Sequence, residues 1–369
     1  MESMVMDNLF GGIYKDKTVL VTGHTGFKGS WLVYWLNQMG ANVIGYSLEA
    51  PSEPNHIGLL NLDITSIIGD IRDLELLNQT FAIHKPDIVF HLAAQPLVRL
   101  SYENPIETYE TNVMGTLKVF EACRAHNVKA IVNITSDKAY ENREWVWGYR
   151  ENDPMGGYDP YSSSKGCADI LANSYRSSYF NPAEYQKSHN TLLASCRAGN
   201  VIGGGDWAKD RLMTDIMLSV SSAKKVSIRN PNATRPWQHV LEPLSGYLAI
   251  GQKLLEEKVE FAEAWNFGPS DEGSITVEEV VNHVKTHWDK IDYEITRDPL
   301  HLHEANLLKL DCSKAHIRLK WKDVWDSETT FEKTVLWYKN FYENNSTTTT
   351  DDLKHYVMDA KKKELEWSL

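Results

Sequence analysis

Hydrophobic residues follow two patterns along this chain. Short runs such as Thr18–Thr22 and Ala130–Ile134 are apolar almost throughout and are followed by glycine or polar residues. Longer segments between such runs, for example Gly29–Met39, carry aromatic and aliphatic residues at helical spacing. Parallel strands that are buried on both faces are apolar almost throughout. Strands that alternate with helices in this way predict a parallel sheet covered on both sides.

The predicted fold class is α/β, a Rossmann-type doubly wound parallel sheet with a smaller C-terminal substrate-binding lobe. The predicted strands are 18–22, 42–46, 87–92, 130–134 and 191–195, and the predicted helices are 29–39, 107–127, 159–179, 243–255 and 275–288. We expect a larger domain over 1–195 that is rejoined by 236–262, a smaller lobe over 196–235 and 263–345, and a solvated tail over 346–369.

Composition and charge narrow the class of protein. The 369 residues, 42% of them hydrophobic, suffice for the cores of two domains at about 150 residues each. With 50 acidic and 38 basic residues the net charge is −12, whereas proteins that bind nucleic acids or anionic membranes need a basic face. The four cysteines have neither disulfide nor zinc spacing. We therefore expect a cytoplasmic globular protein without a metal site.

Three glycines, Gly23, Gly26 and Gly29, lie between the first predicted strand and the first predicted helix. Glycine at this junction permits a tight turn and lets backbone N–H groups and the helix N-terminus approach a pyrophosphate. The spacing GxxGxxG differs from GxGxxG and is typical of short-chain dehydrogenases. The motif therefore predicts a dinucleotide site.

The second predicted strand bears on the choice between NAD and NADP. NAD sites usually have a carboxylate near the end of this strand, and NADP sites have an arginine nearby. Here Ser47 takes the expected position of the acid, and Glu49 is the nearest carboxylate. No Lys or Arg occurs from Ser30 to Ile71 to pair with a 2′-phosphate, which favours NAD. Asp70 and Ile71 follow the third predicted strand, where they could bind adenine.

A tyrosine and a lysine, Tyr161 and Lys165, lie four residues apart and hence on one face of a predicted helix. A tyrosine that acts as a base near pH 7 needs its pKa lowered by about three units, which a nearby ammonium group can favour. Ser136 follows the strand Ala130–Ile134, at the carboxyl edge where ligands of such sheets bind. Together, the three residues predict a proton-relay set for oxidising an alcohol.

With these motifs in place, the chain resembles the extended short-chain dehydrogenases/reductases that act on nucleotide sugars, and among them the CDP-glucose 4,6-dehydratase branch. The stretches that carry the resemblance are 22–32, 91–95, 135–140, 141–165, 197–211, 234–240 and 265–269. They extend over nearly the whole chain, and 141–165 is the most specific of them because general sugar epimerases lack it.

The resemblance implies NAD-dependent dehydration of CDP-glucose to a 4-keto-6-deoxy sugar, in deoxysugar biosynthesis. It implies Tyr161 as the base at the C4 hydroxyl, helped by Ser136 and Lys165, and Asp137 as the acid that protonates the departing C6 hydroxyl. Residues implied in cofactor binding are Gly23, Thr25, Gly26, Phe27, Lys28, Gly29, Asp70, Ile71, Leu92, Ala93, Ala94, Tyr161 and Lys165.

Lys138 departs from the wider dehydratase pattern. The dTDP-glucose enzymes have a glutamate at this position as the base at C5, whereas the CDP-glucose enzymes also have lysine. A lysine base must be neutral, which requires its pKa to fall by several units. We expect Lys138 to be catalytic, and its role as the C5 base stays open.

The substrate is expected to contact placed polar and cationic side chains. The resemblance suggests Asn200, Arg211 and Arg235 for the diphosphate and nucleotide, with Gln95 and His239 lining the sugar pocket. Trp145, Trp147 and Trp207 are interpreted as packing residues rather than base-stacking ones. The family tends to dimerise through helices that flank the sheet, so a homodimer or higher homo-oligomer is expected.

Two other functions stay open. A nucleotide-sugar 4-epimerase, or a 4,6-dehydratase acting on another nucleotide hexose, would share the cofactor fold. A 4-epimerase does not need the pair Asp137-Lys138, however. A dinucleotide-sensing protein without activity would usually have lost Tyr161 or Lys165, and both are present.

Overall fold

The computed structural model describes most of the chain. It covers residues 6–208, 211–222, 224–228, 231, 234–269, 274–296 and 307–369, with the backbone alone at Arg235 and Ser274. No helix among these residues is long and apolar enough to cross a membrane.

A seven-stranded parallel sheet, in the order β10-β6-β5-β4-β1-β2-β3, forms the centre of the larger part. Its strands are β1 Thr18–Thr22, β2 Asn42–Ser47, β3 Thr65–Ile68, β4 Ile88–His91, β5 Ala130–Ile134, β6 Leu192–Ala198 and β10 Ala264–Phe267. The strand order reverses between β1 and β4, and ligands of such sheets bind beside this switch point. The predicted strands are confirmed, with ends that differ by up to three residues.

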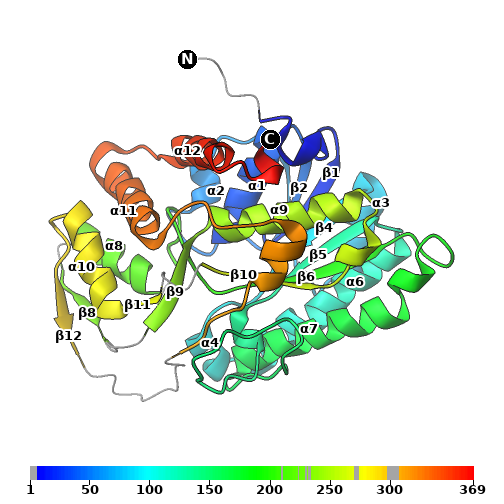
Figure 1. Cartoon of the computed structure of the whole chain (residues 1–369), viewed down its shortest axis with the longest axis horizontal. Helices are drawn as coiled ribbons and strands as arrows, with labels where there is room; N and C mark the ends of the chain where they lie inside the picture. The colour runs from blue at the N-terminus through cyan, green and yellow to red at the C-terminus, as the bar shows by residue number, and fades with distance from the viewer. Residues whose placement is uncertain are drawn as a thin grey trace.

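Helices cover both faces of the sheet (Figure 1). One face packs against α1 Phe27–Gln38 and α9 Leu241–Leu255, and the other against α3 Leu74–His84, α6 Thr116–Ala125 and α7 Pro160–Ser178. Short helices α2 His56–Leu59, α4 Val98–Glu103 and α5 Pro105–Tyr109 connect them.

The helix predicted over 107–127 is interrupted. The structure has α5, a π-helical turn η2 over Glu110–Gly115, and then α6. Asn112 within the turn is buried, and its side chain bonds both to the backbone of Gln95 and to the Ser164 hydroxyl. Such turns often occur at functional sites, and hydrophobic spacing alone does not show them.

The smaller part contains two short sheets and three helices among the described residues. One sheet has the order β11-β9-β7 and the other pairs β12 with β8. The strands are β7 Asn200–Ile202, β8 Val226–Ile228, β9 Thr234–His239, β11 Ser274–Thr276 and β12 Tyr293–Ile295, and the helices are α8 Leu212–Ser221, α10 Val277–His287 and α11 Ser327–Asn344. The domain boundaries given above stay a prediction.

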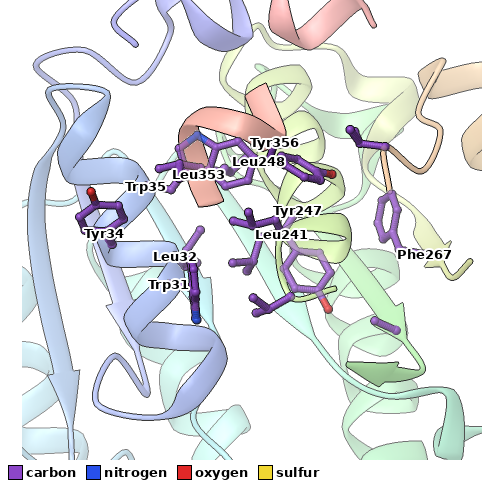
Figure 2. Close-up of a cluster of buried hydrophobic side chains, with 14 of the residues drawn as sticks. Trp31, Leu32, Tyr34, Trp35, Leu241, Tyr247, Leu248, Phe267, Leu353 and Tyr356 are labelled. Carbon is purple, nitrogen blue, oxygen red and sulfur yellow. The ribbon is translucent and has the colours of Figure 1, made fainter. Parts of the chain in front are cut away.

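The C-terminal segment is packed, so the prediction of a solvated tail is wrong. Helix α12 Thr349–Lys362 buries Leu353 and Tyr356, and the Tyr356 ring lies edge-on to Trp35 at 5.8 Å. Figure 2 shows both side chains of α12 meeting Trp35 of α1 and Leu248 of α9. Lysines and threonines make this segment polar on average, but its apolar residues form a stripe at helical spacing. That stripe is buried only because α12 packs against α1 and α9.

A buried carboxylate, Glu242 on α9, fastens this segment. It accepts hydrogen bonds from the backbone amides of Val324 and Trp325 at 3.0 and 2.8 Å and from the Tyr356 hydroxyl at 2.8 Å. Burial raises its pKa to about 8, and these hydrogen bonds act in the opposite direction.

We expect Glu242→Ala to lower the free energy of unfolding by about 3 kcal/mol, because it leaves two buried N–H donors without an acceptor. Urea denaturation followed by tryptophan fluorescence measures this. Glu256→Ala, at the partly exposed end of the same helix, is the control and should change stability by less than about 0.5 kcal/mol. Equal effects of the two substitutions would show that apolar packing alone holds the segment.

Candidate active site

The glycine-rich turn has the geometry of a phosphate cradle. Gly23 has φ +75°, and a Cβ there would lie 2.8 Å from the Ala93 nitrogen, while a Cβ on Gly29 would collide with the Gly23 carbonyl. Helix α1 begins at Phe27, and its N-cap Gly26 offers no capping side chain. The uncapped helix start and the glycines of the turn fit a dinucleotide pyrophosphate.

The end of β2 carries a neutral hydroxyl network. The Ser47 hydroxyl lies 2.8 Å from the Thr25 hydroxyl and 3.1 Å from His24 Nδ1, and His24 Nε2 lies 2.7 Å from the Ser66 hydroxyl. Burial lowers the pKa of His24 to about 4, so this imidazole is uncharged at neutral pH. The Thr25 side chain thus joins β2 instead of reaching toward the turn, and only its backbone stays a candidate for the cofactor.

Asp70 and Ile71 follow β3, as predicted, but the Asp70 carboxylate is already paired. Arg72 Nη2 donates to it at 2.6 Å and Arg72 Nε at 3.0 Å. The hydrogen bonds from Arg72 are the main cause that lowers the pKa of Asp70. Ile71 is buried.

The loop after β4 runs beside the glycine turn. The amides of Leu92 and Ala93 both donate to the Thr22 hydroxyl at 3.2 Å, and Ala94 follows them, partly buried. The loop therefore lines the carboxyl edge of the sheet at the switch point.

The predicted catalytic residues come together at the end of β5. Tyr161 and Lys165 project from the first turns of α7, which Asp159 caps by accepting from the Ser162 amide at 2.9 Å. Tyr161 shares a hydrogen bond with Ser136, and the Lys165 ammonium donates to the Ile134 carbonyl at 3.1 Å. The buried Asp137 accepts from the Ser136 hydroxyl at 2.9 Å and from the Lys138 amide at 2.8 Å.

Burial shifts the pKa values of Tyr161 and Lys165 in opposite directions, and each shift disfavours the charged form. Burial raises the pKa of Tyr161 to about 12, and the hydrogen bond with Ser136 opposes that shift. Burial lowers the pKa of Lys165 to about 8, and the charge of Asp169 opposes that shift. A phenolate at neutral pH therefore needs further positive charge beside Tyr161.

Two further cations surround this cluster. Burial lowers the pKa of Lys28 to about 8, with the charges of Lys165 and Arg211 acting in the same direction. Lys28 therefore lies within electrostatic range of the catalytic cluster. Arg211 bonds to Asp206 at 2.6 Å and also interacts electrostatically with Tyr161. These cations can hold the phosphates of an anionic ligand.

Asn200 and Arg235, which were also predicted to contact the substrate, lie on β7 and β9. Asn200 follows Gly199, where a Cβ would lie 3.2 Å from the Asp137 carboxylate, so Asn200 starts β7 beside the catalytic cluster. The backbone of Arg235 in β9 pairs with that of Ile275 in β11, and the Arg235 side chain lies outside the described part of the structure.

The two predicted sugar-pocket residues, Gln95 and His239, both have partners inside the fold. His239 is 1% exposed and packs edge-on between Trp31 and Trp325, at ring distances of 5.9 and 4.9 Å. The Gln95 side chain donates to the Leu97 carbonyl and the Thr108 hydroxyl, and it thereby closes its own loop. Sequence position alone could not show that both polar groups are engaged inside the fold.

The three tryptophans that were interpreted as packing residues differ in their exposure. Trp207 is buried against Trp337 at 5.7 Å, as predicted, and Trp145 stacks on Tyr149 at 5.4 Å. Trp147 is 69% exposed, so its interpretation as a packing residue is wrong.

As a set, these residues can support the oxidation of an alcohol by a bound nicotinamide cofactor and the departure of a neighbouring hydroxyl. A tyrosine, a serine and a lysine suit the first step, and a buried carboxyl group one residue from the serine suits the second. Within the described ranges, no cluster of three or more His, Cys, Asp or Glu could hold a metal ion.

Comparisons with known proteins agree with this geometry. Residues 20–335 match the family model described as GDP-mannose 4,6 dehydratase. The chain is 57% identical to the CDP-glucose 4,6-dehydratase of Salmonella typhimurium, over 88% of this chain and 91% of that protein.

Solved structures confirm the predicted fold class. The dTDP-glucose 4,6-dehydratase of Bacillus anthracis, in complex with NAD, gives a TM-score of 0.73 at 23% identity over 89% of this chain and 98% of that one. The UDP-glucose 4-epimerase of Thermotoga maritima, with UDP-glucose, gives 0.74 at 22% identity over 88% and 99%. The chain belongs to the nucleotide-sugar 4,6-dehydratase family of extended short-chain dehydrogenases/reductases.

Proposed function

We propose that the protein is an NAD-dependent hydro-lyase that converts CDP-glucose to CDP-4-keto-6-deoxyglucose. The observation that carries the proposal is the buried Asp137 carboxyl group, hydrogen-bonded to Ser136 beside Tyr161. A 4-epimerase needs the serine and the tyrosine but has no departing hydroxyl to protonate. The likeness to the Salmonella protein supports CDP-glucose as the substrate.

The cofactor would lie along the glycine turn, with its pyrophosphate at the start of α1. When bound, NAD takes up the hydrogen of C4 as hydride and later returns it to C6. Tyr161 accepts the proton of the C4 hydroxyl, and Ser136 hydrogen-bonds the same oxygen. Arg211 supplies positive charge that favours the Tyr161 phenolate, and Lys165, one turn further along the same helix, would add to it.

The elimination step uses the loop after β5. The C4 ketone acidifies the hydrogen at C5, so a base can remove it while the C6 hydroxyl leaves as water. Asp137 donates a proton to that hydroxyl, and Lys138 is the candidate for the base at C5. Arg211 and Asn200 would hold the diphosphate and nucleotide.

The test is to incubate the purified protein with NAD and CDP-glucose and to follow the sugar nucleotide by mass spectrometry. Loss of one water without net accumulation of NADH is the expected result. Unchanged mass with a new sugar epimer would favour the 4-epimerase, and no change with any of the CDP-, dTDP-, UDP- or GDP-hexoses would contradict an enzyme of this class.

We also propose a homodimer formed through α5, η2 and α7. Exposed apolar side chains gather on adjacent helical segments there: Ile106 of α5, Met114 of η2, and Ile170 of α7. A second copy related by a twofold axis would cover this patch with the same residues.

Ile170→Glu is expected to convert the dimer to a monomer, because it would bury a charge at the centre of that patch. Light scattering after gel filtration measures the mass. Ile83→Glu, at an exposed isoleucine on α3, is the control and should leave the mass unchanged. A parent protein that is already monomeric would contradict the proposed interface.

A further inference from the structure

The helix that carries Tyr161 and Lys165 also carries a buried acid, Asp169, that the chemistry above does not use. Asp169 lies four residues after Lys165 and hence on the same face of α7. It forms a bidentate ion pair with Arg197 of β6, with Nη2 to Oδ1 at 2.9 Å and Nε to Oδ2 at 3.0 Å. Both side chains are almost completely buried.

The pair reaches the loop that holds the other catalytic residues. The Thr135 hydroxyl donates to Asp169 Oδ2 at 2.6 Å, and Thr135 directly precedes Ser136. Arg197 Nη1 donates to the Tyr140 hydroxyl at 2.6 Å and to the Glu151 carbonyl at 3.0 Å. The ion pair therefore holds residues on both sides of the segment Ser136–Ala139.

The charges around the pair also act on Lys165. The charge of Asp169 favours the ammonium form of Lys165 against the effect of burial. Lys28 of α1 and His91 of β4 also interact electrostatically with Lys165, and burial lowers the pKa of His91 to about 3. Asp169 itself also interacts with Arg176 of α7, in addition to Arg197 and Thr135.

We propose that Asp169 is a positioning residue of the active site: with Arg197 it fixes Thr135, and so the Ser136–Lys138 segment, against α7, and it supplies the negative charge that faces the Lys165 ammonium. If the ion pair were only structural, it would stabilise the fold without acting on the chemistry. A buried ion pair is, however, weak evidence for added stability. The proposal rests on the proposed function of Tyr161 and Lys165.

The charge is tested with Asp169→Asn. Removing the negative charge favours the neutral form of Lys165, so the decline of kcat at high pH should begin about one pH unit lower than in the parent. Competitive labelling of amines with acetic anhydride, read by peptide mass spectrometry without substrate, should show the same downward shift for Lys165. Asp352→Asn, which breaks a buried ion pair between α12 and α11, is the control and should shift neither curve.

The position is tested with Thr135→Val, which keeps the volume and every charge. We expect kcat to fall about tenfold, with little change in KM and an unshifted pH profile, and Thr135→Ser to restore kcat. Unchanged kcat in Thr135→Val would overturn the positioning role, and this variant decides it even if Asp169→Asn does not fold. Equal loss of rate in Asp169→Asn at every pH, with unshifted labelling of Lys165, would overturn the electrostatic role.

A failure of the proposed function is distinguishable from these results. A parent protein that does not dehydrate CDP-glucose would contradict the function, whereas the labelling of Lys165 would still decide whether Asp169 acts on it.

Discussion

Tyr161→Phe will lower the rate of CDP-glucose dehydration by about 10³-fold, because it removes the group that receives the proton of the C4 hydroxyl. Tyr161 is the hydroxyl side chain of α7 that shares a hydrogen bond with Ser136. Phenylalanine keeps the aromatic ring and its packing, so the melting temperature should hardly change. Loss of water measured by mass spectrometry gives the rate, and no NADH should accumulate, since oxidation at C4 comes first.

Tyr175→Phe is the matched control. Tyr175 lies on the same helix, about four turns beyond Tyr161, and its hydroxyl donates to Glu121 of α6 at 2.7 Å. This variant should keep its turnover. If Tyr161→Phe kept more than a tenth of the parent rate, Tyr161 would not be the base.

Asp137→Asn is expected to separate oxidation from elimination. Asparagine fills the same space and its oxygen can still accept from the Lys138 amide, but it has no proton to give to the departing C6 hydroxyl. We expect dehydration to fall by about 10²- to 10⁴-fold, while oxidation at C4 proceeds and NADH accumulates to one equivalent per active site. Absorbance of NADH in a single turnover, together with the mass of the sugar nucleotide, measures both steps.

Lys138→Met tests the base at C5 in the same assay. If Lys138 removes the C5 proton, this variant should also stop after oxidation, but it should lose the exchange of the C5 hydrogen with deuterated solvent. Asp137→Asn should keep that exchange. Normal dehydration by Asp137→Asn would contradict its role as the acid, and normal exchange by Lys138→Met would assign the C5 base to another group.

The parts of the site that could be predicted from the sequence depend on local geometry. A strand that turns into a helix around a pyrophosphate needs glycines such as those at 23, 26 and 29. Residues four apart, such as Tyr161 and Lys165, share one face of any helix. Ser136 and Asp137 follow a buried strand, so their place at the sheet edge follows from the topology of parallel sheets.

Other features could not be predicted from the sequence because they depend on contacts between distant segments. His239 packs between Trp31 and Trp325, and Tyr356 packs against Trp35. The local sequence does not show whether the fold encloses a polar residue near a motif. It also does not show whether another helix covers the apolar stripe of a largely polar helix.

The sequence by itself determined the parallel α/β sheet and the glycine turn, and it predicted the catalytic set, since these follow from periodicity and from spacing within single elements. Only the tertiary structure decided that Asp169 joins Arg197 and Thr135, that Lys28 lies within electrostatic range of the catalytic cluster, and that residues 349–368 pack on the sheet domain. The physical reason is that burial and charge pairing are properties of the packed chain: each depends on residues far apart in sequence that folding brings into contact.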